Sequence, residues 1–165
     1  MKKLINKKVL SETSLYYGDI KLPSDWKIDR DQLLLHEVYA DTKNQDFIPC
    51  PPFDILNSYI IEHCFVEYNL VVENIKSWGT EYNPLETSKP FCHVDYDDVL
   101  KSPDYILLYG VRAEDCTVRV KYKDNKYLDK QWNITLENNK FIMFPSSCMY
   151  YIENKQKEKS NFIHC

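Results

Sequence analysis

The stretch Cys116-Thr-Val-Arg-Val-Lys-Tyr122 alternates apolar and polar side chains without a break. Val118 and Val120 fall on one face of an extended chain, and Arg119 and Lys121 fall on the other, because successive side chains of a strand point to opposite sides. The pattern predicts a β-strand with one face in a core and one face in solvent.

Short apolar runs separated by turn residues lie on both sides of this strand. The predicted strands are residues 70–78, 104–111, 116–122, 131–136, 140–144, 149–152 and 161–164, with one or two short strands within 1–20. About seven or eight short strands at this spacing predict a jelly roll. We expect its core to contain Ile106, Leu108, Val118, Val120, Ile142 and Phe144.

Helical periodicity precedes the strands. Residues 28–39 and 53–67 are predicted helices, and the second has an apolar stripe formed by Phe53, Leu56, Ile60 and Cys64, with Tyr59 and Phe65 beside it. No repeat or linker divides the chain. We therefore expect one domain over 1–165, mostly β with N-terminal helices, in which an α/β part (1–67) packs on a jelly-roll core (68–165).

Composition narrows the class of function. The net charge is −4, so a nucleic-acid-binding module, which normally has a basic face, is not expected. Neither a membrane span nor a signal peptide is visible, and the six cysteines form no CxxC pair. We expect reduced thiols and no secretion by a signal peptide. Aromatic residues make up 14% of the chain, which suits strands and interfaces.

One pair of residues could bind a metal. His93 and Asp95 are separated by one residue, so on an extended chain both side chains point the same way and could supply two ligands to one ion. The alternative reading is a loop histidine capped by a nearby acid.

The order of several short motifs resembles a known superfamily. Trp78 after an apolar run, a loop with Tyr82, His93-x-Asp95, the run 105–111 and the late stretch 140–146 are similar to the 2-oxoglutarate/Fe(II) oxygenases, most of all to short bacteriophage-encoded members. The resemblance covers roughly residues 68–163. It implies a double-stranded β-helix with Fe(II) at its open mouth, held by two histidines and one carboxylate, and 2-oxoglutarate bound by a basic residue.

Matched to that pattern, the chain supplies part of the metal site. His93 and Asp95 correspond to the first two ligands, while the place of the second histidine falls at or near Tyr150. His164 is the alternative third ligand. The place of the basic residue falls among Lys157 and Lys159, and lysine is not equivalent to arginine at a site that binds a carboxylate through two hydrogen bonds.

The incomplete triad leaves two main functions open. The first is a non-catalytic component of a phage virion, such as a neck, tail or capsid-associated protein, with other protein subunits as partners and no cofactor. Its location is then the virion or the host cytoplasm. The alternative is an active Fe(II)/2-oxoglutarate dioxygenase (a hydroxylase), with His93, Asp95 and Tyr150 or His164 on iron and Lys157 or Lys159 on the co-substrate. A cupin-like small-molecule binder is a third option.

Overall fold

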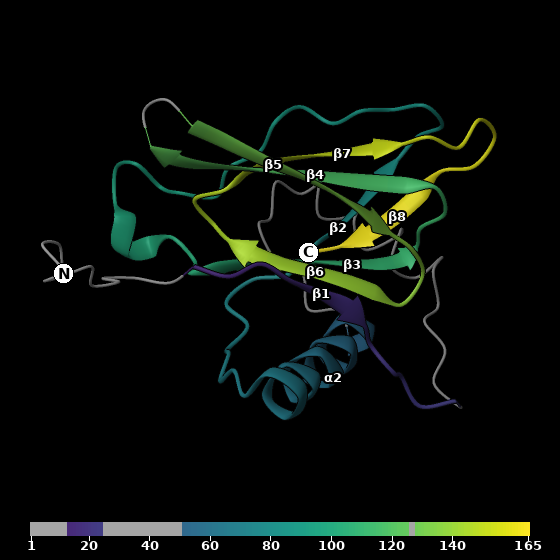
Figure 1. Ribbon diagram of the computed structural model, residues 1–165. Coiled ribbons are helices and arrows are strands. Elements are labelled where there is room, and N and C mark those ends of the chain that lie inside the picture. Colours follow the sequence, from purple (N-terminus) through teal and green to yellow (C-terminus); the bar gives the residue numbers. More distant parts are fainter. Residues whose placement is uncertain (1–12, 25–50, 126–127) are drawn as a thin grey trace, which may run out of the picture.

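The structure, a computed structural model, describes residues 13–24, 51–125 and 128–165. These residues form two antiparallel sheets, one α-helix and one short 3-10 helix (Figure 1). The five-stranded sheet has the order β1-β6-β3-β8-β2 and the three-stranded sheet the order β5-β4-β7. In chain order the elements are β1 (Tyr16–Asp19), α2 (Pro51–Tyr68), β2 (Gly79–Tyr82), η1 (Val99–Lys101), β3 (Tyr105–Arg112), β4 (Cys116–Asn125), β5 (Leu128–Leu136), β6 (Lys140–Pro145), β7 (Met149–Asn154) and β8 (Asn161–His164).

The chain crosses repeatedly between the two sheets, which lie face to face (Figure 1). From β3 it enters the three-stranded sheet through the β4–β5 hairpin, returns to the other sheet as β6, crosses to β7 and returns as β8. This strand order is that of a jelly roll, and the fold class predicted from the sequence is confirmed.

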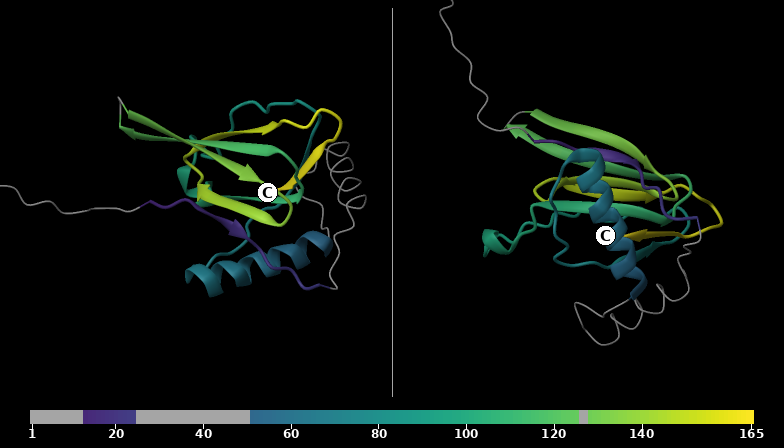
Figure 2. Two further views of the ribbon diagram at one scale, coloured as in Figure 1. Left: turned by 45° about the vertical axis from the view of Figure 1, so that its right-hand side comes forward. Right: turned by 90° about the horizontal axis from the view of Figure 1, so that it is seen from below.

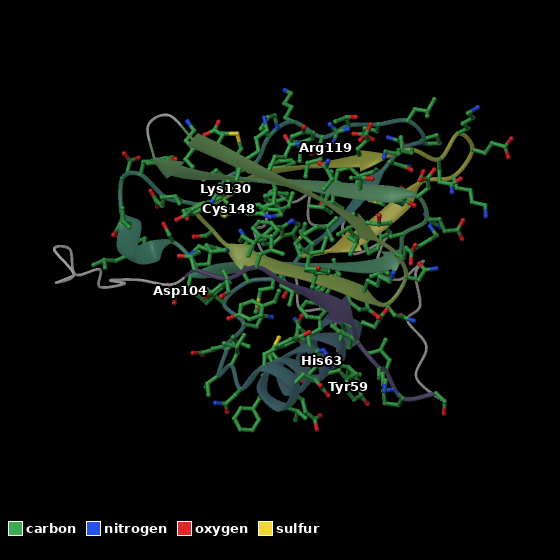
Figure 3. All side chains as sticks on the ribbon, viewed as in Figure 1. Tyr59, His63, Asp104, Arg119, Lys130 and Cys148 are labelled. Atoms are coloured by element: carbon green, nitrogen blue, oxygen red, sulfur yellow. The ribbon has the colours of Figure 1, made fainter. Side chains whose placement is uncertain are left out.

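The main core fills the space between the sheets, as the side chains in Figure 3 show. It is built from the inward-facing residues of both sheets, as period-two alternation requires. All six residues predicted as core are buried: Ile106, Leu108, Val118, Val120, Ile142 and Phe144.

Helix α2 covers the outer face of the five-stranded sheet (Figures 1 and 2). Leu56, Ile60 and Cys64 are buried there and form a second core with residues of β3, β6 and β8, as the predicted stripe requires. Phe65, expected beside the stripe, is instead 54% exposed. The helix ends before Asn69, whose φ of 53° is a left-handed conformation that asparagine tolerates. Among the described residues, no helix is long and apolar enough to cross a membrane.

The predicted strand over residues 70–78 is wrong, because residues 70–77 pair with no strand in the described part of the chain, and only Trp78 exchanges backbone hydrogen bonds with Cys165, just beyond β8. Leu70 and Val72 pack against the second core while Val71 and Ile75 are exposed. The alternation arises because one side of this extended connection is buried. The connection lacks the ladder of hydrogen bonds that defines a strand. The strand begins at Gly79 instead and pairs with β8. The predicted helix over 28–39 lies outside the described residues, and the division of the domain at residue 67 stays a prediction.

Candidate functional site

An extended segment before His93 lies along the edge of β7. Thr87 bridges to Glu153, and Phe91 bridges to Tyr150 through two backbone hydrogen bonds of 2.7 and 2.9 Å. Residues directly opposite each other in an antiparallel pair point to the same face. His93 lies two residues beyond Phe91, so the pairing directs its imidazole toward the side chain of Tyr150.

His93 and Tyr150 form a hydrogen-bonded pair. The Nε2 atom of His93 lies 3.0 Å from the hydroxyl oxygen of Tyr150, and the two rings are stacked with centroids 5.8 Å apart. Tyr150 is buried, and burial raises the pKa of its phenol far above the ordinary range. Burial also lowers the pKa of half-buried His93. These shifts favour the neutral form of both groups, and the tautomer of His93 decides which of the two atoms donates in the hydrogen bond.

Aromatic side chains surround this pair. The ring of Trp78 lies 5.5 Å from that of His93, and Phe91 and Phe144 lie 5.7 and 5.0 Å from Tyr150 between ring centroids. A cavity of about 560 Å³ opens beside His93 and is lined by Trp78, residues 70–76 and residues 101–107. The apolar surroundings explain why both titratable groups favour their neutral forms.

Asp95 is committed to its own loop. Its Oδ1 atom accepts hydrogen bonds from the backbone N–H groups of Asp97 (2.9 Å) and Asp98 (3.1 Å). The side chain is exposed. This is the local bonding that aspartate makes at turns, so Asp95 stabilises the loop after His93, while the hydrogen bond of the His93 ring is to Tyr150.

His164 lies on the other side of the five-stranded sheet. Within β8, Ile163 faces the core between the sheets, and His164 shares the face of Phe162, which packs against α2. The Nε2 atom of His164 lies 2.8 Å from Oδ1 of Asn57 on α2. Complete burial lowers the pKa of His164 to about 3. The structure does not bring this residue to His93.

Lys157 and Lys159 are exposed in the turn between β7 and β8. Lys159 lies 3.4 Å from a carboxylate oxygen of Glu114, measured from its Nζ atom. The turn follows Asn154 at one end of β7, whereas Tyr150 lies near the other end. The two lysines are therefore not placed beside the His93–Tyr150 pair.

The side chains at this site do not fit a three-ligand iron centre. In the part of the chain that the structure describes, no group of three or more His, Cys, Asp or Glu side chains could hold a metal. Tyrosine binds iron as its phenolate, but the raised pKa of Tyr150 keeps the proton on its hydroxyl, which the hydrogen bond to His93 uses. We therefore derive no reaction step through iron.

Sequence reasoning found His93 and Tyr150 but missed what holds them together. The bridges of Thr87 and Phe91 to β7 determine the contact, and the apolar residue two positions before His93 was the available signal. The Asn57–His164 contact between α2 and β8 joins residues 107 positions apart, and no pattern in the sequence indicates it.

The fold defines a jelly-roll protein, and the site defines a neutral histidine–tyrosine pair at the margin of its core. No protein-family model matches the chain, and no curated protein matches it in sequence. Among solved structures, the chain is similar to a prolyl-4-hydroxylase of Pseudomonas putida at 12% identity and a TM-score of 0.48. That match covers 92% of this chain and 82% of the other.

Proposed function

We propose that the protein is a non-catalytic jelly roll that acts by binding other protein subunits, as a structural component of a phage virion such as a neck, tail or capsid-associated protein. The observation that carries the non-catalytic part is the hydrogen bond of 3.0 Å between His93 and Tyr150. This hydrogen bond occupies the two atoms that would have to bind iron, Nε2 of His93 and the hydroxyl oxygen of Tyr150. The raised pKa of Tyr150 also keeps its hydroxyl protonated.

Exposed apolar side chains support a binding role. Val71 and Ile75 are 88% and 78% exposed on one side of the cavity beside His93. Tyr96 and Leu100, before and within η1, are 82% and 96% exposed. Exposed aromatic and apolar side chains are typical anchors of protein interfaces. The virion assignment rests on the sequence resemblance to phage-encoded proteins alone, and it stays a proposal.

The test is an anaerobic Fe(II) titration with and without 2-oxoglutarate, observed through the weak visible charge-transfer band of the ternary complex. The proposal expects no band and no tight iron binding, in the parent protein and in His93→Ala alike. A band in the parent that disappears in His93→Ala overturns the non-catalytic assignment. Mass spectrometry of purified phage particles tests the virion assignment, and absence of the chain from the particles overturns it.

An active Fe(II)/2-oxoglutarate dioxygenase is the second candidate, and the cavity beside His93 favours it. The adjacent cavity of about 560 Å³ has the size of a small-molecule site. Should the iron band appear, the Tyr150→Phe variant tests whether Tyr150 is the third ligand.

A further inference from the structure

Strand β5 has a free edge that borders a large groove. Within the described residues, β5 pairs with β4 alone and β1 pairs with β6 alone, so each is the outermost strand of its sheet. A groove of about 920 Å³ lies between these two edges and is lined by Tyr17 to Asp19 and Gln131 to Thr135. Figure 2 (right) shows both strands along one margin of the sandwich.

The groove lies against the edge of β5 and not against one of its faces. Consecutive residues line it, from Gln131 to Thr135, and consecutive residues of a strand alternate between the two faces. What these five residues share is their backbone, on the side of β5 that faces away from β4. At that side, alternate backbone N–H and C=O groups point away from β4, so the groove gives access to groups that a further strand could pair.

The part of this edge from Gln131 onward lacks the features that usually keep monomeric sheets apart. From Gln131 to Leu136 the strand has no charged residue and no proline, and its irregularity lies at the far hairpin end, near Lys123. Native proteins usually protect a long edge with lysine, proline or a bulge. Trp132, at the middle of the edge, remains 41% exposed. An edge of this length and composition is expected to be paired.

We propose that the free edge of β5 pairs antiparallel with β5 of a second copy of this chain. The pairing would join two three-stranded sheets into one continuous sheet across a two-fold axis. This interface involves neither His93 nor Tyr150, so it goes beyond the proposed function and stands whether or not the site binds iron.

The sequence of β5 is complementary to itself. With Asn133 on the two-fold axis, Trp132 of one copy faces Ile134 of the other, twice, and Gln131 faces Thr135, twice. Aromatic residues opposite β-branched residues, and polar opposite polar, are favourable cross-strand pairs. An arbitrary partner strand would have to supply this alternation, whereas a second copy supplies it by symmetry.

The arrangement brings one pair of like charges together, at its margin. Lys130 would face the apolar Leu136, and Asp129 would face Glu137 beyond the end of the strand. Glu137 is already paired with Lys140, whose Nζ lies 2.6 Å from its carboxylate. The groove beside the edge provides the space that the incoming strand and the ring of Trp132 need.

The test measures the mass of the full chain in solution by sedimentation velocity over a concentration series. The variant Gln131→Lys/Thr135→Lys places like charges across the proposed axis, as does Gln131→Glu/Thr135→Glu. We expect the parent to dimerise and each variant to raise the dimer dissociation constant by about tenfold or more. Mixing equal amounts of the lysine and glutamate variants should restore dimers, because opposite charges then face each other.

A matched control adds the same charge elsewhere. Thr87→Lys/Met149→Lys lies at the other edge of the same sheet, and it should dimerise as the parent does. A parent that stays monomeric up to its solubility limit overturns the proposal, as does a dimer that neither β5 variant weakens.

Discussion

His93 and Tyr150 lie 57 positions apart in the chain, yet the Nε2 atom of the first lies 3.0 Å from the hydroxyl oxygen of the second. The bridge between Phe91 and Tyr150 creates this contact by aligning the segment before His93 with β7. A histidine predicted as a metal ligand is thus one member of a neutral hydrogen-bonded pair. The contribution of this pair to the free energy of unfolding can be measured in the absence of metal.

Replacing Tyr150 by phenylalanine removes this hydrogen bond and keeps the ring. We expect the free energy of unfolding to fall by about 1 kcal/mol, because the ring remains packed and half-buried His93 can still be solvated. Urea denaturation of Tyr150→Phe, His93→Ala and the double variant gives the coupling free energy, expected to be about 1 kcal/mol. A loss above about 3 kcal/mol in His93→Ala would contradict its place at the margin of the core.

Acid should destabilise the protein through His164. Its folded-state pKa of about 3 lies below its unfolded value of 6.5, so below pH 6.5 the unfolded state binds a proton that the folded state excludes. The stability contribution is complete above pH 6.5 and decreases as pH falls toward 3. At about 1.4 kcal/mol per pH unit, roughly 2 kcal/mol is lost by about pH 5.

The variant His164→Gln isolates this contribution to acid sensitivity. Urea midpoints measured between neutral pH and about pH 5 should vary less in this variant than in the parent. Equal slopes in the parent and in His164→Gln would show that His164 does not control acid stability.

Gly110 should tolerate no side chain. A Cβ atom there would collide with the backbone carbonyl oxygen of Glu137, at the irregularity where β3 meets β8. Backbone cannot move aside as a flexible side chain can, so Gly110→Ala should cost about 3 kcal/mol. Gly18→Ala is the control, since its Cβ would meet the Tyr68 hydroxyl at 3.2 Å and should cost much less. Thermal unfolding of both variants checks the difference.

Asn154 holds the turn between β7 and β8 in place. Its buried Nδ2 atom lies 2.9–3.0 Å from the backbone carbonyl oxygens of Tyr82, Asn83 and Lys159, and its Oδ1 accepts from Asn161 at 2.9 Å. Asn154→Asp would place a carboxylate against these carbonyl oxygens. We expect a loss of about 3 kcal/mol or more, because the second carboxylate oxygen would face three carbonyl oxygens with no donor.

The exposed Asn83 provides the comparison for that substitution. Asn83→Asp introduces the same charge on the same loop, and chemical denaturation should detect a change of about 0.5 kcal/mol or less. Similar losses in the two variants would mean that the network around Asn154 contributes little to stability. A far larger loss in Asn154→Asp would identify it as the residue that fixes the approach of β8 to β2.

The strands of the jelly roll could be predicted because their signal is local. Val118 and Val120 alternate with Arg119 and Lys121, and this pattern alone specifies which face of β4 is buried. The stripe of α2 likewise predicted Leu56, Ile60 and Cys64 at the sheet. The same logic failed at residues 70–78, because alternation reports one-sided burial, whereas a strand also needs a partner backbone.

By itself, the sequence determined the later strands, the buried stripe of α2, six core residues and the mostly-β class, since each depends on side chains close together in the chain. Only the tertiary structure decided which sheet each strand joins, and so which distant residues meet. The pairing of residues 87–91 with β7 brings His93 into hydrogen-bond contact with Tyr150. Alternation within β8 directs His164 toward Asn57, away from that pair. Long-range register depends on the packing of the whole sandwich, and no local pattern encodes it.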